Sequence, residues 1–246
     1  MKKMMNKTGV IIQARLGSTR LPGKVLLDLQ GYPVLYHVFK RMQQIDDVDV
    51  VIATSQASGD DQIEEFCMKN DVACFRGSEE NVLERFYQTA VNFDFDTIVR
   101  ITSDCPLIDP KIAADIIDFY NNSNCDLATN GGSDPANRTF PRGMDVSVFS
   151  FEVLEEAYKN ARSKAEKEHV TPYIYEHKEV AYFKQDKDQS YYRLTLDTRE
   201  DFELIQKIYE ELYKEGEIFY LKDVIDLLEK KPELSRINQD VKQKKA

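Results

Sequence analysis

GVIIQARLGSTRLPGKVL, residues 9–26, joins a short apolar run to a loop with two glycines and three basic side chains. The uninterrupted run at Val10–Ile12 is typical of a strand that is buried in a parallel sheet. In open α/β sheets, ligands bind at the loops that leave the carboxyl ends of the strands. The stretch therefore predicts a buried strand followed by a ligand-binding loop.

Outward from this stretch, apolar runs alternate with helical patterns. Further strands are predicted at 48–55, 72–75, 97–103, 180–184 and 192–197. Apolar residues recur at helical spacing at 63–67, 82–90, 112–120, 151–162, 166–177 and 202–212. This alternation predicts an α/β fold of Rossmann-like type, with a mostly parallel sheet and helices on both faces.

Local signals mark several helix ends. Asp109 followed by Pro110 is a typical N-cap and first helical position. Ser78 is a candidate cap for the helix that follows it, and Thr198 for the last long helix. Gly216 is predicted to stop that last helix.

The chain length of 246 residues fits one large domain, which we place at 8–246. A segment rich in Gly, Pro and Asn at 124–147 interrupts the alternation. We interpret 126–184 as an inserted lobe or edge hairpin, a kind of region that often carries substrate specificity or dimer contacts. The last residues, 238–246, are expected to form a solvated tail.

The composition excludes several classes of function. A net charge of −10 without a long basic run argues against nucleic acid as a partner. No long apolar segment and no secretory leader pattern are present, so we expect a cytoplasmic protein without membrane contact. Four cysteines without CxxC spacing suit reduced thiols, and three histidines argue against a His-rich metal site.

The opening loop matches neither common phosphate-binding motif. Five residues separate Gly17 from Gly23, and Val25 stands where a Walker loop needs Ser or Thr. The dinucleotide fingerprint GxGxxG is also absent.

The loop nevertheless has the chemistry of an anion site. Gly17, Ser18 and Thr19 can offer backbone amides, while Arg15, Arg20 and Lys24 supply positive charge. These cations could offset the charge of a triphosphate. The alternative is a solvated basic loop between a strand and a helix.

Two aspartates follow predicted strands, Asp104 in RITSDCPLID and Asp197 in RLTLDTREDF. Carboxylates on separate strand ends, together with phosphate oxygens, are the ligands that Mg²⁺ prefers. They are therefore candidate magnesium ligands. The alternative for Asp197 is a turn or cap residue before Thr198.

ARLGSTRLPGK resembles the A-R-x-G-S-x-R-x-P-x-K loop of cytidylyltransferases that activate sugar acids, such as CMP-Kdo synthetase and acylneuraminate cytidylyltransferase. The likeness is greatest to spore-coat polysaccharide biosynthesis proteins of the F type. It continues through RGSEENVLERFYQTA, VRITSDCPLIDP, RTFPRGMDV, EHVTPYIYE and LTLDTREDFELI. The resemblance implies a nucleotide-diphospho-sugar transferase fold, CTP and Mg²⁺ as ligands, an anionic acceptor and a homodimer.

The resemblance also assigns residues. The catalytic set is Arg15, Lys24, Asp104 and Asp197, with Asp104 and Asp197 as metal ligands. The nucleotide-binding set is Ala14, Arg15, Gly17, Ser18, Arg20, Lys24, Arg76, Ser78, Asn81, Arg85 and Ser103.

Residues of the lobe at 126–184 are expected to contact the acceptor. Arg138 and Arg142 suit a carboxylate or phosphate because a guanidinium offers paired donors. Asp145 and Asn130 could hold hydroxyl or other polar substituents, and His169 is a further candidate. The alternatives are a structural histidine, dimer contacts, and an ion pair between Arg142 and Asp145.

The expected reaction is attack of an acceptor oxygen on the α-phosphorus of CTP with release of pyrophosphate. No residue pair identifies a general base. A sugar-1-phosphate nucleotidyltransferase that uses another nucleotide is the nearest alternative. A GT-A glycosyltransferase would carry a D-x-D motif, which SDCPLID lacks, and a non-catalytic nucleotide-binding scaffold subunit would not need both aspartates and the loop cations.

Overall fold

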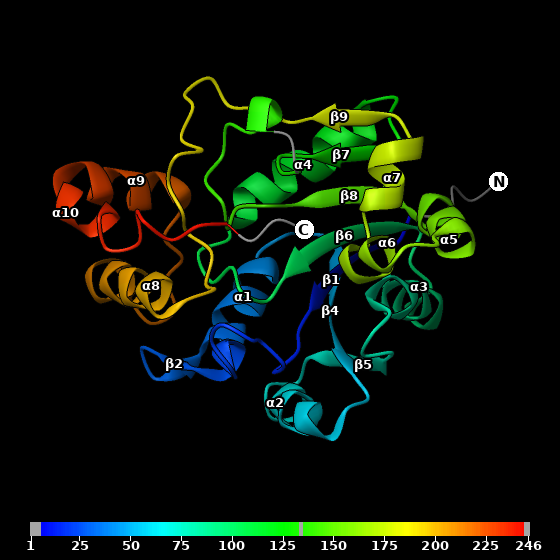
Figure 1. The fold of residues 1–246 in the computed structure, drawn as a ribbon, viewed down its shortest axis with the longest axis horizontal. Coiled ribbons are helices and arrows are strands. Elements are labelled where there is room, and N and C mark those ends of the chain that lie inside the picture. Colours follow the sequence, from blue (N-terminus) through cyan, green and yellow to red (C-terminus); the bar gives the residue numbers. More distant parts are fainter. Residues whose placement is uncertain (1–5, 133–134, 244–246) are drawn as a thin grey trace.

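The computed structural model describes residues 6–132 and 135–243, and its core is a seven-stranded sheet (Figure 1). Across the sheet the strands lie in the order β5-β4-β1-β6-β8-β7-β9. Their bounds are β1 Thr8–Gln13, β4 Val48–Ser55, β5 Ala73–Gly77, β6 Thr97–Thr102, β7 Leu127–Thr129, β8 Ser147–Ser150 and β9 Val180–Tyr182.

Strand directions confirm the mostly parallel sheet. β1 pairs in parallel with β4 on one side and β6 on the other, and β4 pairs in parallel with β5. β8 runs antiparallel to both β6 and β7, and β9 is parallel to β7. The chain therefore leaves β1 toward one edge and later returns to its other side. In open sheets such a reversal marks the place where ligands bind, which here is the carboxyl ends of β1 and β6.

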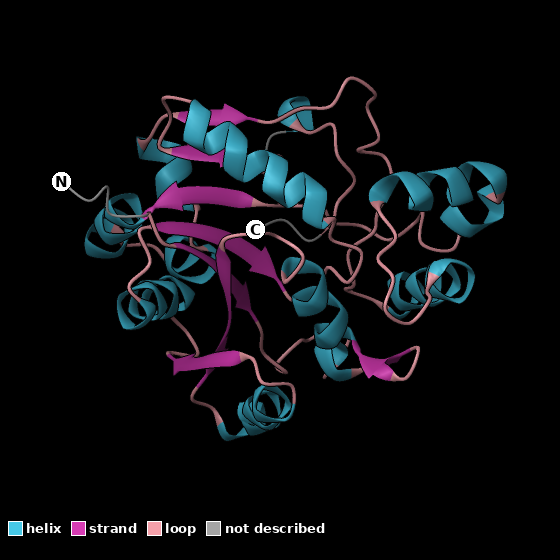
Figure 2. Cartoon of the chain, turned by 180° about the vertical axis from the view of Figure 1, so that it is seen from behind, coloured by secondary structure: helices cyan, strands magenta, loops and turns pink. Residues whose placement is uncertain are grey.

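Helices cover both faces of the sheet (Figures 1 and 2). One face packs against α1 Val34–Met42, α2 Asp61–Lys69 and α4 Pro110–Asn122. The opposite face packs against α3 Val82–Phe93, α5 Phe151–Asn160 and the neighbouring helix α7 Pro172–His177. Each helix turns one apolar stripe toward the sheet, as its sequence period predicts.

A third apolar cluster lies beside the sheet, where α8 Arg199–Leu212 and α9 Leu221–Lys230 pack together (Figure 1). The remaining short elements are β2 Asp28–Leu29, β3 Tyr32–Pro33, α6 Lys164–His169, α10 Pro232–Ser235 and the 3₁₀ turns η1 Lys24–Leu26, η2 Ser58–Asp60 and η3 Pro135–Asn137.

Three predictions of local structure are wrong. Residues 192–197 are extended but make only one bridge, from Arg193 to Arg142, because they run between the sheet and the third cluster. The predicted helix at 166–177 is two helices, since Val170 has φ 69° and Pro172 starts a new one. The helix that Gly216 was predicted to stop, α8 Arg199–Leu212, ends four residues before that glycine.

The predicted cap of α3 is also corrected. Asn81 occupies the N-cap position, and its side chain accepts a hydrogen bond from the Glu84 amide. Ser78 lies three residues earlier, and its hydroxyl accepts a hydrogen bond from the Asn81 amide. By contrast, Asp109 and Thr198 cap α4 and α8 as predicted.

Residues 126–184 extend the sheet rather than standing apart from it, because β7, β8 and β9 continue the hydrogen-bonded ladder from β6. The expected solvated tail at 238–246 is corrected at its first residue. Asn238 is buried and its amide donates to the Arg193 carbonyl at 3.0 Å. Residues 244–246 lie outside the described residues.

Within the described ranges, all four cysteines are unpaired. No helix in those ranges combines the length and the apolar character needed to span a membrane.

Candidate active site

Lys24, Asp104 and Asp197 meet at the carboxyl edge of the sheet, although each comes from a different segment. Lys24 opens η1, Asp104 follows β6, and Asp197 precedes α8. The Nζ atom of Lys24 lies 2.7 Å from Oδ2 of Asp104 and 2.9 Å from Oδ1 of Asp197. It also donates to the Leu196 carbonyl at 2.7 Å. The structure thus brings together three of the four residues predicted to be catalytic.

The loop after β1 is shaped by Gly23, whose φ of 68° is in the left-handed region that favours glycine. Its amide donates to the Leu16 carbonyl at 3.1 Å, which closes the loop on itself. The Leu16 amide donates to Oδ1 of the buried Asp60 at 2.7 Å, which ties the loop to η2. Lys24 therefore leaves a closed loop and points toward the two carboxylates.

The ions of this cluster favour one another's charged forms. Burial alone would lower the pKa of Lys24, but Asp104 and Asp197 outweigh it and the pKa is raised. Burial would raise the pKa of Asp197, but Lys24, Arg20 and Arg193 lower it. The stabilisation from Asp197 is lost as pH falls below about 3.8, and that from Lys24 only as pH rises above about 10.5. Lys24 and Asp197 are therefore both ionised at neutral pH.

Asp197 has two further cationic partners. Nη2 of Arg20 lies 2.8 Å, and Nη2 of Arg193 2.9 Å, from Oδ2 of Asp197. Arg193 is held in turn by the fully buried Asp201, with Nε 2.8 Å from Oδ1. The Asn238 amide also donates to Asp201 at 2.9 Å. Sequence reasoning missed Arg193, Asp201 and Asn238.

The predicted nucleotide residues of the loop differ in their surroundings. Arg15 pairs with Glu168 at 3.7 Å, so the end of α6 lies beside the loop. Open space borders Gly17. The Ser18 amide is bonded to the Leu16 carbonyl at 2.7 Å, so it does not take part in the predicted amide nest. Ala14 and Ser103 donate their amides to neighbouring strands, at Ala53 and Gln13.

In the predicted base-binding segment, the side chains of Arg76 and Arg85 are already bonded to other residues of the protein. Arg76 donates to the Ser55 and Ala57 carbonyls, each at 2.9 Å, and pairs with Glu64 and Asp61. Arg85, whose exposed fraction is 1%, donates to the Ser78 carbonyl at 3.1 Å.

Burial, with a smaller contribution from Arg15, lowers the pKa of Arg85 to about 10. A base-binding role for Arg76 stays a prediction that requires rearrangement of its four contacts.

The predicted acceptor residues differ in whether their side chains are already bonded within the protein. Asn130 is buried, and both ends of its amide bond to backbone, at Met144 and Val146. Arg138 forms an ion pair with Asp145, so the alternative pair of Arg142 with Asp145 is wrong.

Arg142 lines a cavity of about 410 Å³ with Tyr191, Tyr192, Arg193 and Asn238. His169 ends α6, the helix whose Glu168 contacts Arg15. The side chains of Asn130, Arg138 and Asp145 are therefore held by contacts within the fold. Arg142 borders a cavity, and His169 ends the helix beside the loop.

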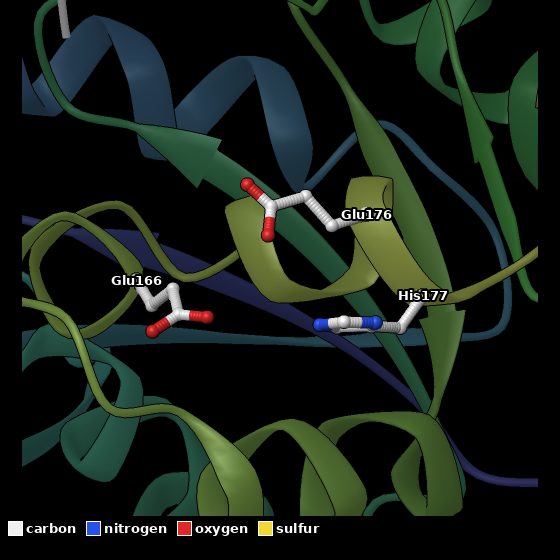
Figure 3. Close-up of side chains that lie close together, drawn as sticks. All are labelled: Glu166, Glu176 and His177. Atoms are coloured by element: carbon white, nitrogen blue, oxygen red, sulfur yellow. The ribbon is translucent and has the colours of Figure 1, made fainter.

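A second group with metal-ligand chemistry comes from α6 and α7 (Figure 3). Glu166, Glu176 and His177 place one ligand atom each within 4.8 Å of one another. Glu166 already accepts from the Arg162 and Ser163 amides as part of a capping box. Exposed acidic groups of this kind are common, and we assign no site to them.

Comparison with known proteins places the chain in a family. The family model for cytidylyltransferases matches residues 9–230. Spore coat polysaccharide biosynthesis protein SpsF of Bacillus subtilis is 33% identical over 241 residues, which cover 93% of this chain and 97% of that protein.

Solved structures agree. A cytidylyltransferase from Leptospira borgpetersenii aligns with a TM-score of 0.85 and 34% identity, covering 97% of this chain and 99% of that one. CMP:2-keto-3-deoxy-manno-octonic acid synthetase complexed with CTP aligns with a TM-score of 0.63 and 19% identity, covering 84% of this chain and 100% of that one, and so shows the shared fold. The predicted resemblance is confirmed, and this chain belongs to the cytidylyltransferase family.

Proposed function

We propose that this nucleotidyltransferase uses CTP and transfers its cytidylyl group to an anionic acceptor such as a sugar acid. An acceptor oxygen forms a bond to the α-phosphorus, the bond to the bridging oxygen breaks, and pyrophosphate leaves. The observation that carries the proposal is the meeting of Lys24, Asp104 and Asp197 at the carboxyl edge of the sheet. The CTP bound by the structurally similar synthetase supports the choice of nucleotide.

The loop cations suit the phosphates of a nucleotide. In the proposed reaction Lys24 binds the departing pyrophosphate and stabilises the charge that develops on it. Arg15 and Arg20 add charge at the rim, where their side chains are 43% and 33% exposed. Because a held nucleotide and acceptor react as one complex, much of the rate enhancement in such a site comes from orientation.

The carboxylates of Asp104 and Asp197 fit a divalent cation. Oxygens of both lie within 2.9 Å of the cationic Nζ of Lys24, so the pair accommodates positive charge between them. We propose that these two residues hold Mg²⁺, which would supply neutralisation of phosphate charge when bound. Without nucleotide, Lys24 and the metal compete for the same oxygens.

The wider context is proposed from the relatives. SpsF is named for spore coat polysaccharide biosynthesis, so we propose a role in a surface polysaccharide pathway. We further propose a cytoplasmic homodimer. Light scattering on the purified protein tests the dimer. A monomer would have the mass of one chain, 28.5 kDa, and a dimer twice that mass.

Thermal stability with CTP, UTP, GTP and ATP, each with and without Mg²⁺, tests the nucleotide. A ligand at about 100 times its Kd adds ~2.7 kcal/mol, which raises Tm by roughly 5–10 °C for a domain of this size. We expect a magnesium-dependent rise with CTP alone. A rise with UTP or GTP instead would favour a sugar-1-phosphate nucleotidyltransferase, and no rise with any nucleotide would contradict the proposal.

Lys24→Ala is expected to change nucleotide and metal binding in opposite directions. CTP affinity falls about tenfold or more, because a charge-assisted contact to phosphate is lost. Mn²⁺ affinity without nucleotide rises, because the competing ammonium group leaves Asp104 and Asp197. Calorimetric titration of each ligand measures both effects. Unchanged CTP affinity would exclude Lys24 from phosphate binding, and the exposed Lys222→Ala serves as the control.

A further inference from the structure

One face of the sheet changes from apolar to polar near the carboxyl end of β6. On that face Ile98 lies beside Phe149 of β8, and Phe149 lies beside Leu127 of β7, all fully buried. One row further along, Arg100 lies beside Ser147, and Ser147 beside Thr129. Arg100 is half-buried, and the part of an arginine that is shielded in such a row is costly unless it meets an anion or acceptors.

Arg100 has no such partner in the described structure. Its guanidinium makes no ion pair or hydrogen bond with residues 6–132 or 135–243, and its Nε is shielded from solvent. Arg41, in contrast, is buried and donates to the Phe219 carbonyl at 2.7 Å. Because native proteins rarely leave a shielded donor unpaired, the Nε of Arg100 requires an explanation.

The carboxylates that act on Arg100 already have other cationic partners. Asp145 and Asp104 are the carboxylates whose charges act on Arg100, and each already forms an ion pair, with Arg138 and with Lys24. The charge of Tyr175 also acts on Arg100, and its hydroxyl borders Gly132. Within the described ranges Arg100 therefore has no acidic partner of its own.

Arg100 adjoins the proposed reaction centre. Arg100 precedes Asp104 by four residues, which is about 13 Å of extended chain at most. Within the sheet it pairs with Ile11 of β1 on one side and with Ser147 of β8 on the other.

Resting on the proposed function, we propose that Arg100 binds the negatively charged group of the acceptor, with Arg138 and the Tyr175 hydroxyl beside it. A carboxylate or phosphate would accept paired hydrogen bonds from the guanidinium and supply the missing charge. The site therefore selects anionic over neutral acceptors. Arg100 is a specificity residue that sequence reasoning did not identify.

Calorimetric titration of Arg100→Met and the unchanged protein tests this. Both are first loaded with the α,β-methylene analogue of CTP, so that the probes cannot bind at the nucleotide loop. The probes are Kdo and N-acetylneuraminate as carboxylates, glucose 1-phosphate as a phosphate, and glucose as the neutral control. At least one anion should bind the unchanged protein tenfold or more tightly than Arg100→Met, whereas glucose should not distinguish them.

Two outcomes overturn the assignment: no anion binds the unchanged protein better than glucose, or every anion binds the variant equally well. Binding of the nucleotide analogue is recorded separately. If the analogue binds neither protein, the proposed function fails, and the same probes titrated into nucleotide-free protein still test the anion site.

Thermal unfolding provides a test that needs no ligand. Arg100→Met should leave Tm unchanged or raise it, because the side chain makes no ion pair or hydrogen bond in the described ranges and its Nε is shielded. Arg41→Met should lower Tm, since it deletes a satisfied donor. A fall in Tm for Arg100→Met similar to that for Arg41→Met would identify Arg100 as structural and overturn the proposal.

Discussion

Asp104→Asn is expected to lower turnover about 1,000-fold while the protein remains folded. This loss corresponds to ~4 kcal/mol of transition-state stabilisation, the size expected when a metal-binding charge is removed. The side chain is 24% exposed, and asparagine keeps the same shape, so Tm should change by only a few degrees. Pyrophosphate release with CTP and an accepted sugar acid measures the effect.

The control for Asp104→Asn is Asp115→Asn, which removes an equal charge from the exposed side of α4. Turnover of that variant should be unchanged. If Asp104→Asn retained full turnover, the assignment of Asp104 as a metal ligand would be wrong. If it lost turnover but bound Mn²⁺ as tightly as the unchanged protein, its role would be to hold Lys24 instead.

Much of the sheet could be predicted because its strands are defined locally. β1, β4, β5 and β6 are short apolar runs with helical patterns between them, and such periods depend on neighbouring residues alone. The segment 192–197 has the same pattern, and Leu194 and Leu196 are indeed buried. It forms no strand because ladder pairing depends on which distant segment lies beside it, and within the described residues that pairing is limited to the bridge between Arg193 and Arg142.

The site was predictable only where its residues carry a recognisable pattern. Lys24, Asp104 and Asp197 stand in motifs, and the structure brings both aspartates within hydrogen-bonding distance of Lys24. Asn130 looked equally polar, yet both ends of its amide are bonded to backbone. Arg100 lies within an apolar strand, and one charge among apolar residues was the only signal that could have identified it.

Asp201→Ala is expected to have the largest effect on stability. Asp201 is fully buried and accepts from Arg193, from the amides of Asp197 and Thr198, and from Asn238. Its loss leaves the Arg193 guanidinium, whose side chain is 9% exposed, with Asp197 as its remaining acidic partner in the described ranges. Breaking such a buried pair costs about 3–5 kcal/mol. Tm should therefore fall by roughly 6–20 °C.

Urea unfolding distinguishes this effect from loss of an ordinary ion pair. Glu203→Ala, on the exposed side of the same helix, should change the free energy of unfolding by about 0.5 kcal/mol or less. Asp201→Asn should be intermediate, because it keeps the acceptor oxygen but loses the charge opposite Arg193. Equal stability of Asp201→Ala and Glu203→Ala would contradict the structural role. Because the Asp197 amide is bonded to Asp201, we also expect the alanine variant to bind Mn²⁺ more weakly, which links the stability of this buried network to the proposed metal site.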